Sequence, residues 1–298
     1  MIFTYRAHDY FSSENIFNRG GFSHLDETDA MSPGALVYCQ NLHYLEIALM
    51  TDNVSCILCP SSLRGESFKT EKTLIYSDDP RMAFFGLYQR LSSDSNFDNA
   101  DRPVMGENCI IHPSAVISPR ASLGNNVEVS ANAVIEHNVV IGDNVYIGSN
   151  AVIGAEGLIT LRNVDGTLMT VKHQGGVKVG AGCQILAGAV IAKALFQKPT
   201  TIEENCQIGI MTNIGHGANI GKNTVISGNT VVAGRTRVGA GVWMGTSCSV
   251  AQGLDIGDGA QIKMGSVVIS NVAAGAVVSG NFAISHRVNM TAHLRKSQ

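Results

Sequence analysis

Aromatic and charged residues are both scarce in this chain of 298 residues. Only 6% of the residues are aromatic, with a single Trp, and the formal net charge is −3. So small a net charge excludes the strong basic balance that draws a protein to nucleic acid. There is no run of 18 apolar residues, and residues 1–10 lack an apolar signal core. We therefore expect a cytoplasmic protein without an integral membrane segment and without a nucleic-acid partner.

A period of six residues organises the chain from residue 202 to residue 262. A mostly small residue stands four positions after each large aliphatic one, and many of the 32 glycines lie between them. This period is neither that of a helix nor that of a simple strand. It is typical of a parallel β-helix, in which the large side chain fills the interior and the small one fits a corner. The large positions are Ile202, Ile208, Ile214, Ile220, Ile226, Val232, Val238, Met244, Val250, Ile256 and Ile262.

The same period occupies an earlier stretch and is interrupted twice. It begins at Ile111 and keeps its phase to Ile153, and it is absent from residues 155–176. A second excursion of five extra residues falls around residues 196–199. The 22 hexads predict a little over seven coils. Loops that leave a regular scaffold often carry binding function, and tolerated surface insertion is the alternative.

Residues 1–103 lack the hexad and read as a small α/β domain. Strand-like runs occur at residues 35–39, 55–59 and 73–76, and residues 43–50 have helical spacing. A second helix is expected to start with Asp79 as N-cap and Pro80 at its first position. The sequence thus predicts an all-β left-handed parallel β-helix at residues 104–280, preceded by this α/β domain and followed by a short tail, 281–298.

Repeat geometry lets sequence distance stand for distance in space, because residues 18 apart share one corner of adjacent coils. His216, Gly234 and Gln252 therefore form one outward column. The imidazole could act as general base and the unshielded Gly234 N–H as oxyanion donor. A histidine that is merely solvated is the alternative.

No metal site is expected, because the histidines and cysteines lack ligand spacing. Three cysteines fall in the small-residue slot, which predicts interior packing rather than chemistry. They are Cys183, Cys206 and Cys248.

Four stretches of the chain resemble one family. They are residues 207–221 around His216, residues 153–157, residues 175–180, and residues 36–44 near the N-terminus. Together they resemble the UDP-3-O-acylglucosamine N-acyltransferases (LpxD), which act in lipid A synthesis. The resemblance covers almost the whole chain.

The resemblance implies roles for individual residues. His216 would be the catalytic base and Gly234 the oxyanion donor. Residues matching Tyr38, Asn41 and Tyr44 hold the uracil ring in the family. Gln252 stands where the family usually has a second His, and His173 lies in the long excursion. Both are candidate substrate contacts.

The implied function is N-acyl transfer from an acyl carrier protein or CoA thioester to a nucleotide-linked amino sugar, in lipid A or cell-surface glycan synthesis. The resemblance implies a homotrimer, and the expected mechanism needs no cofactor. Gln252 and the short tail favour an alternative, CoA-dependent N-acylation of a dTDP- or UDP-linked amino-deoxysugar for surface polysaccharide. A third possibility is a non-catalytic trimeric solenoid that binds nucleotide sugars.

Overall fold

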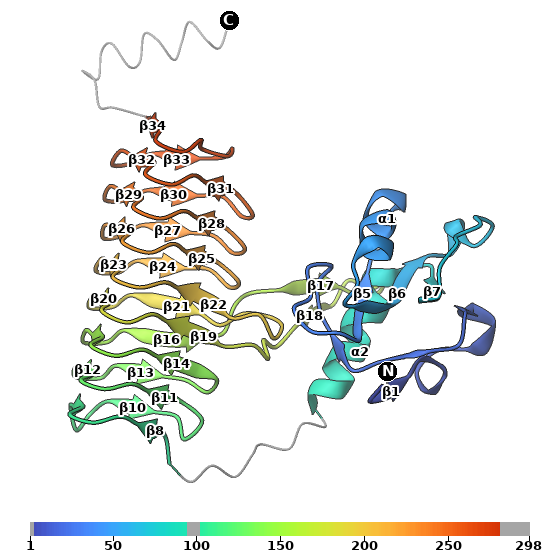
Figure 1. Cartoon of the computed structure of the whole chain (residues 1–298), viewed down its shortest axis with the longest axis horizontal. Helices are drawn as coiled ribbons and strands as arrows, with labels where there is room; N and C mark the ends of the chain where they lie inside the picture. The colour runs from blue at the N-terminus through green and yellow to red at the C-terminus, as the bar shows by residue number, and fades with distance from the viewer. Residues whose placement is uncertain (1–2, 94–101, 281–298) are drawn as a thin grey trace, which may run out of the picture. The chain divides into compact units, whose positions relative to one another are not determined.

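The computed structural model describes residues 3–93 and 102–280, which form two compact units (Figure 1). Of these residues, the solenoid unit comprises 102–155, 177–192 and 200–280. The N-terminal unit comprises residues 3–93 together with Glu156–Gly176 and Lys193–Pro199. The predicted tail, 281–298, and residues 94–101 near the end of the predicted α/β domain lie outside the described residues.

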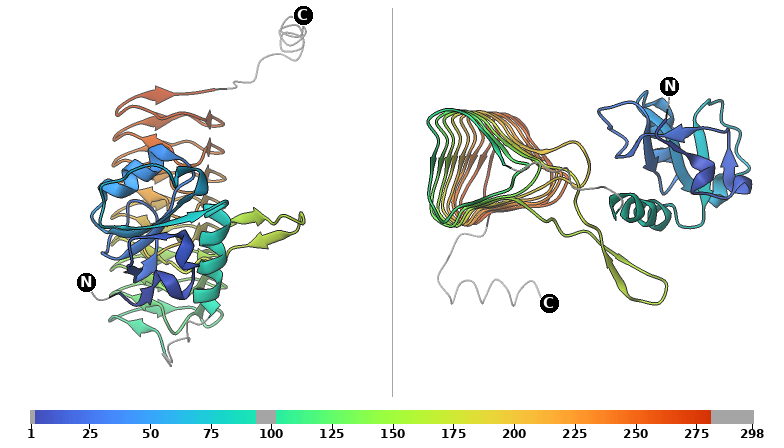
Figure 2. Two further views of the ribbon diagram at one scale, coloured as in Figure 1. Left: turned by 90° about the vertical axis from the view of Figure 1, so that its right-hand side faces the viewer. Right: turned by 90° about the horizontal axis from the view of Figure 1, so that it is seen from below.

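The solenoid unit is a parallel β-helix built from three sheets of short strands, which confirms the predicted fold class. Pairs such as Ile214↔Val232 and Val232↔Val250 join residues 18 apart. Seen along the axis, the coils superimpose as a three-sided outline (Figure 2).

We name each sheet by its first strand. The β10 sheet contains β10 (Val116–Ile117), β13 (Val134–Ile135), β16 (Val152–Ala155), β21 (Val190–Ala192), β24 (Asn213–Ile214), β27 (Val231–Val232), β30 (Ser249–Val250) and β33 (Val267–Val268). The β8 sheet contains β8 (Val104–Met105), β11 (Ser122–Leu123), β14 (Val139–Ile141), β19 (Val177–Val179), β22 (Thr200–Ile202), β25 (Asn219–Ile220), β28 (Arg237–Val238) and β31 (Asp255–Ile256). The β9 sheet contains β9 (Ile110–Ile111), β12 (Glu128–Val129), β15 (Tyr146–Ile147), β20 (Gln184–Ile185), β23 (Gln207–Ile208), β26 (Val225–Ile226), β29 (Trp243–Met244), β32 (Gln261–Ile262) and β34 (Val277–Val278).

The solenoid is longer than the hexads predict. Strand β8 precedes the expected start at Ile111 and already pairs with β11, and β33 and β34 follow Ile262. The end positions are harder to recognise because an end coil is covered on one side only. Met105, which fills the large slot of the first coil, is 49% exposed.

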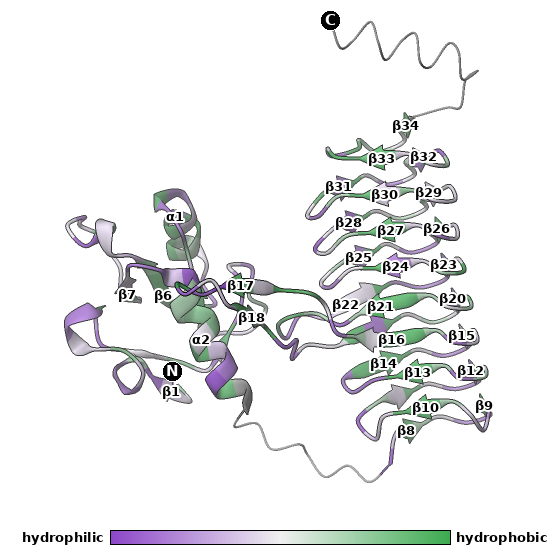
Figure 3. Ribbon diagram, turned by 180° about the vertical axis from the view of Figure 1, so that it is seen from behind, coloured by the Kyte–Doolittle hydropathy of each residue, from purple (hydrophilic) through white to green (hydrophobic). Residues whose placement is uncertain are grey.

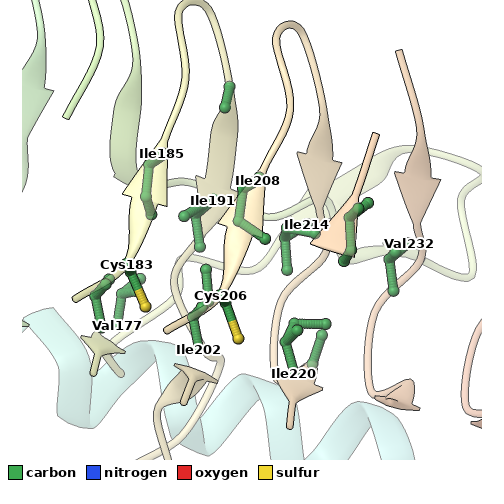
Figure 4. Packing of buried hydrophobic residues seen from close by; sticks show 14 of the residues in the cluster. Val177, Cys183, Ile185, Ile191, Ile202, Cys206, Ile208, Ile214, Ile220 and Val232 are labelled. Atoms are coloured by element: carbon green, nitrogen blue, oxygen red, sulfur yellow. The ribbon is translucent and has the colours of Figure 1, made fainter. Parts of the chain in front are cut away.

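The interior of the solenoid is a stack of aliphatic side chains, as predicted. Ile185 lies beside Ile208 and Ile191 beside Ile214 on adjacent coils (Figure 4). The buried small slots include threonines whose hydroxyls donate to backbone carbonyls of the next coil at 2.9–3.1 Å. Buried polar groups are thereby satisfied. Cys183, Cys206 and Cys248 occupy the same kind of slot and are buried, which confirms their packing position. Burial also raises the pKa of Cys248.

The corners depend on one left-handed residue per turn, three positions after the large aliphatic residue. Asn fills this slot at many corners, with φ between 55° and 59°, as in Asn126, Asn223 and Asn229. Gly217 fills it in the His216 turn, with φ 68°. Asn and Gly tolerate this conformation better than other residues. In Figure 3 most strands of the β10 sheet are hydrophobic, whereas the corner turns are paler or hydrophilic.

The N-terminal unit has a five-stranded sheet in the order β2-β7-β6-β5-β4. Alternate residues of the strands face two separate hydrophobic cores: Leu36, Leu58 and Ile75 pack with α2, and their neighbours pack with α1. The two helices therefore cover opposite faces. The main elements are β2 (Ile16–Phe17), β4 (His24–Leu25), β5 (Ala35–Tyr38), α1 (Leu42–Met50), β6 (Val54–Pro60), β7 (Thr73–Ser77) and α2 (Pro80–Ser93). Smaller ones are β1 (Tyr5–Arg6), η1 (Ala7–Asp9), η2 (Ser13–Asn15), β3 (Gly21–Phe22) and η3 (Ser61–Leu63).

The predicted start of α2 is confirmed. The N–H of Met82 donates to the Asp79 carboxylate at 2.9 Å, and Pro80 is the first residue of the helix. This is the arrangement of an N-cap followed by proline at the first helical position.

Both excursions from the solenoid belong to the core of the N-terminal unit. The first carries an antiparallel hairpin, β17 (Thr160–Arg162) and β18 (Leu168–Thr170). Leu161 from the first excursion and Phe196 from the second pack in the same core as Phe84. The Tyr88 hydroxyl donates to the Leu195 carbonyl at 2.6 Å. The excursions thus have a structural role, which the sequence alone did not indicate.

Candidate functional site

The predicted corner column is present in the β10 sheet. Because Ile214, Val232 and Val250 pair in register, His216, Gly234 and Gln252 occupy equivalent turn positions on three successive coils. Two backbone hydrogen bonds tie these turns together. Arg235 N–H donates to the His216 carbonyl at 2.9 Å, and Gly253 N–H donates to the Gly234 carbonyl at 3.0 Å.

The imidazole of His216 rests directly on Gly234. A Cβ at position 234 would lie 2.8 Å from His216 Nε2 and 3.0 Å from Cδ2. Only glycine leaves room for the ring in this position. Gly234 is buried, so the expectation that nothing shields its N–H is wrong for this arrangement.

The backbone N–H of Gly234 has no protein acceptor in the described part of the chain, whereas the equivalent N–H at other corners donates to a side chain. At corners of the β8 sheet, the equivalent N–H groups of Lys222 and Ala240 donate to the carboxylates of Glu203 and Asp258, at 3.0 and 2.8 Å. Within residues 3–93 and 102–280, the Gly234 N–H has no hydrogen-bond acceptor. It is therefore not committed to a protein acceptor.

Arg235, which sequence reasoning did not single out, places a cationic side chain at the same corner. It occupies the left-handed slot with φ 60°. This conformation costs a side-chain-bearing residue roughly 1–2 kcal/mol. Its side chain passes over Gly217, where a Cβ would lie 3.6 Å from Arg235 Cγ. An arginine in a slot that holds Asn or Gly at many corners is the sequence signal that could have identified it.

Gln252 lies exposed on the next coil, with its amide open to solvent. An amide can both donate and accept hydrogen bonds, but it cannot take up a proton as an imidazole does. The corner therefore combines one base, one backbone donor, one cation and one neutral hydrogen-bonding group.

Tyr38, Asn41 and Tyr44 lie close in sequence but face different surroundings in the N-terminal unit. The Tyr38 ring is half-buried and packs against Phe84, with ring centroids 5.0 Å apart. Asn41 is the N-cap of α1, where its side-chain oxygen accepts the Tyr44 N–H at 3.2 Å. The Tyr44 ring is 51% exposed and contacts His43. Asn41 and Tyr38 thus have structural roles, and of the two tyrosines it is Tyr44 that exposes its ring.

His173 is fully buried and presents no surface to a substrate. Its Nδ1 lies 3.5 Å from Glu156 Oε2, and its backbone N–H donates to the same oxygen at 3.1 Å. Gly157 packs on the ring, since a Cβ there would lie 2.5 Å from His173 Nε2. Burial lowers the pKa of His173, which favours the neutral imidazole.

The same carboxylate holds a buried lysine. Lys193 Nζ lies 2.5 Å from Glu156 Oε1, and the lysine side chain is 3% exposed. Burial alone would raise the pKa of Glu156, but hydrogen bonds from Lys193 and the His173 N–H bring that pKa below its ordinary value. This ion pair joins the two excursions where each leaves the solenoid sequence.

Neither metal ligation nor membrane insertion is indicated by the described residues. No group of three or more His, Cys, Asp or Glu side chains in that part of the chain is arranged to hold a metal ion. No helix among the described elements is long and apolar enough to span a bilayer.

A hollow of about 720 Å³ in the solenoid unit lies along another corner and does not include His216. Its central charges satisfy each other, because the Arg237 guanidinium makes two hydrogen bonds to Asp255 at 2.5 and 2.9 Å. We therefore place the candidate site at the corner of His216, Gly234, Arg235 and Gln252, where the Gly234 N–H has no acceptor among the described residues.

Comparison with protein families identifies the repeat. The model of the bacterial transferase hexapeptide (six repeats) matches residues 102–137, 120–155 and 199–234. The model of the hexapeptide repeat of succinyl-transferase matches residues 235–270. No curated protein matches the chain in sequence.

Several solved structures are similar to this chain at low sequence identity, and the first of them shares its fold. The UDP-N-acetylglucosamine acyltransferase from Campylobacter jejuni is 22% identical, with a TM-score of 0.53 over 66% of this chain and 80% of that protein. Its counterpart from Arabidopsis is 22% identical, with a TM-score of 0.48 over 62% of this chain and 71% of that one. The UDP-N-acetylglucosamine O-acyltransferase (LpxA) from Moraxella catarrhalis is 25% identical, with a TM-score of 0.41 over 65% and 76%.

Proposed function

Because the chain carries the hexapeptide repeats of bacterial transferases, we propose that it is an acyltransferase whose reaction takes place at the His216 corner. The observation that carries the proposal is the contact between the His216 imidazole and the bare backbone of Gly234. A general base beside an uncommitted N–H donor is what acyl transfer from a thioester requires. The fold shared with the Campylobacter jejuni acyltransferase supports the same class of reaction.

The proposed reaction is N-acylation of a nucleotide-linked amino sugar. His216 removes a proton from the sugar ammonium, and the freed amine attacks the thioester carbonyl to give a tetrahedral intermediate. The Gly234 N–H donates to the oxyanion. The C–S bond then breaks, the thiolate leaves and takes up a proton, and the amine nitrogen loses its second proton. Base catalysis contributes typically 10²–10⁴ in rate, and one oxyanion donor about 10²–10³.

The neighbouring side chains suit the remaining parts of such substrates. The Arg235 guanidinium matches phosphate oxygens, which occur in both a nucleotide diphosphate and a CoA donor. Gln252 can hydrogen-bond a sugar hydroxyl. Tyr44 offers an exposed ring to a base, whereas His173 is excluded as a substrate contact by its burial. We further propose a homotrimer, in which this corner faces a neighbouring copy.

A donor-by-acceptor activity matrix tests the proposal. Carrier-protein and CoA thioesters of short and long chains are crossed with UDP- and dTDP-linked amino sugars, for wild type and His216→Ala. We expect at least one productive pair, with kcat reduced by about 10²–10⁴ in the variant. His112→Ala is the control, because His112 is an exposed histidine at the turn after β9.

The productive pair also identifies the branch of the reaction. Transfer of a long hydroxyacyl chain from carrier protein to a UDP-3-O-acylglucosamine supports the lipid A reaction. Transfer of a short chain from CoA to an amino-deoxysugar supports the surface-polysaccharide reaction. Failure of every pair, with nucleotide sugars still bound, would refute enzymatic function and favour a binding protein.

A further inference from the structure

The turn that carries His216 is held differently from the turns around it. At other corners the left-handed residue donates its backbone N–H to a backbone carbonyl of the preceding coil. Asn229 donates in this way to Ile210 at 2.9 Å, and Gly253 donates to Gly234 at 3.0 Å. In both pairs the acceptor stands two residues after the large aliphatic residue of its hexad.

The second excursion takes this acceptor away from the His216 turn. Because Ile191 pairs with Ile214, the equivalent acceptor would be the carbonyl of Lys193. The chain leaves the repeat at Lys193. Among the described residues, no backbone carbonyl accepts the N–H of Gly217, which is the left-handed residue of this turn.

The hydroxyl of Thr200 takes the place of the missing carbonyl. Thr200 Oγ1 accepts the Gly217 N–H at 2.8 Å. Thr200 is the first residue of β22, is fully buried, and pairs with Val177. A hydrogen bond to a buried group is stronger than one in water. The turn is therefore anchored by one side chain in place of the backbone.

Two hydrogen bonds together fix the peptide unit between His216 and Gly217. Its carbonyl accepts the Arg235 N–H at 2.9 Å, and its N–H donates to Thr200. A peptide unit is planar, so holding both of its polar groups sets its orientation. That orientation sets the direction in which the His216 side chain leaves the backbone.

The imidazole depends on this support because its contact with Gly234 is close. A Cβ at position 234 would lie 2.8 Å from His216 Nε2. Misplacement of a reacting group by 1 Å can lower a rate about 10²-fold. A loosened turn would therefore move the base relative to the Gly234 N–H.

From these contacts we infer that Thr200 is a positioning residue for the His216 base, and that its hydroxyl replaces the backbone acceptor lost to the second excursion. The inference rests on the proposed acyl transfer at His216. Thr200 acts through the peptide unit that follows His216, and it contacts neither substrate nor the reacting atoms.

Thr200→Val tests the inference, because valine keeps the shape of threonine and lacks the hydroxyl. We expect kcat to fall about tenfold or more, with the KM of both substrates nearly unchanged. Thr200→Ser keeps a hydroxyl, so its kcat should stay within about threefold of wild type. In the His216→Ala background, Thr200→Val should lower the rate no further, because the base that it positions is already absent.

Thr224→Val is the matched control. Thr224 is also fully buried, and its hydroxyl accepts the Val242 N–H at 3.1 Å and donates to the Gly239 carbonyl at 2.9 Å. The turn that it holds, residues 239–242, contains no histidine. Thr224→Val should therefore lower the melting temperature at least as much as Thr200→Val, and its kcat should stay within about threefold of wild type.

Hydrogen exchange of the Gly217 amide in the full chain, measured by NMR, needs no substrate. We expect faster exchange in Thr200→Val, and the wild-type rate in Thr200→Ser and Thr224→Val, because only the first variant removes the acceptor. If His216→Ala keeps the wild-type rate of acyl transfer while Gly217 exchanges faster in Thr200→Val, the reaction is wrongly assigned and the anchoring of the turn stands.

Three outcomes overturn the inference. The first is a Thr200→Val variant that keeps its kcat while His216→Ala loses activity. The second is a further loss of rate when Thr200→Val is added to His216→Ala, which would show that Thr200 acts elsewhere. The third is unchanged exchange of the Gly217 amide in Thr200→Val.

Discussion

Replacement of Gly234 by alanine isolates the contact on which the proposed site depends. The backbone at this position does not lie in the left-handed region, so alanine is compatible with its conformation. The new Cβ would lie 2.8 Å from His216 Nε2, where ordinary contacts are about 3.5–4.0 Å. The ring must therefore move by several tenths of an ångström or rotate away. The displaced ring is the one proposed to take the proton.

We expect Gly234→Ala to lower kcat by about 10²-fold or more, the lower bound of what a positioned general base supplies. That loss corresponds to about 2.7 kcal/mol of transition-state stabilisation. The free energy of unfolding should change little. Replacing glycine by alanine lowers the conformational entropy of the unfolded chain, which contributes about 0.4–1 kcal/mol of stability and offsets part of the crowding. The assay is steady-state acyl transfer with the best pair of the matrix, alongside thermal unfolding.

Gly228→Ala is the matched control for this experiment. Gly228 occupies the same turn position at the neighbouring corner, and its added Cβ would meet Ile210 Cγ1 and the Ile210 carbonyl, each at 3.0 Å. The Cβ at Gly234 would likewise lie 3.0 Å from the His216 carbonyl. The two variants share the backbone crowding and differ in the histidine. Equal activity of the two variants would refute the reasoning.

Further predictions concern the groups around the excursions and α1. Glu156→Gln should lower the free energy of unfolding in urea by about 1.5–3 kcal/mol, because the buried Lys193 loses its charged partner. Lys193→Met should leave that free energy nearly unchanged, and equal losses in the two variants would contradict this prediction. Asn41→Ala should destabilise α1 by about 0.5–2 kcal/mol because it removes the N-cap, and Asn41→Ser should not, because serine can also cap a helix. A raised KM for the nucleotide sugar in the stable Ser variant would instead indicate that Asn41 contacts the nucleotide base. Burial lowers the pKa of His173 in the folded protein below its ordinary value of 6.5. As the pH falls, His173 therefore takes up a proton more readily in the unfolded chain than in the folded one, and the free energy of unfolding decreases below about pH 6.5. His173→Gln should therefore flatten the fall of the unfolding free energy between about pH 7 and pH 5, and exposed His43→Gln should leave it unchanged.

The repeat was predictable because each hexad carries its own information. A large aliphatic residue at Ile214 and the same residue type 18 positions away specify the register of the coils, and the pairing Ile214↔Val232 follows. The column of His216, Gly234 and Gln252 could be placed for the same reason. Local signals sufficed equally for α2, where Asp79 and Pro80 mark the start.

Features that depend on contacts distant in sequence were missed. Leu161 and Phe196 pack into the core of the N-terminal unit although they lie far from α2 in the sequence. No periodic pattern in the sequence predicts this packing. The burial of His173 follows from Glu156 and from the close approach of Gly157, not from its own neighbours in sequence. Shielding of Gly234 by the histidine ring likewise depends on a side-chain orientation that a hexad pattern does not specify.

The most direct test of the proposed reaction is the rate of acyl transfer by wild type and His216→Ala with the same thioester and amino-sugar pair. The variant leaves the coil interior intact, because the buried side chain of this turn is Ile214 and not His216. We predict transfer by the wild type and a kcat reduced by about 10²–10⁴ in His216→Ala. A variant that keeps its rate within a few-fold of wild type would contradict the assignment of His216 as the base.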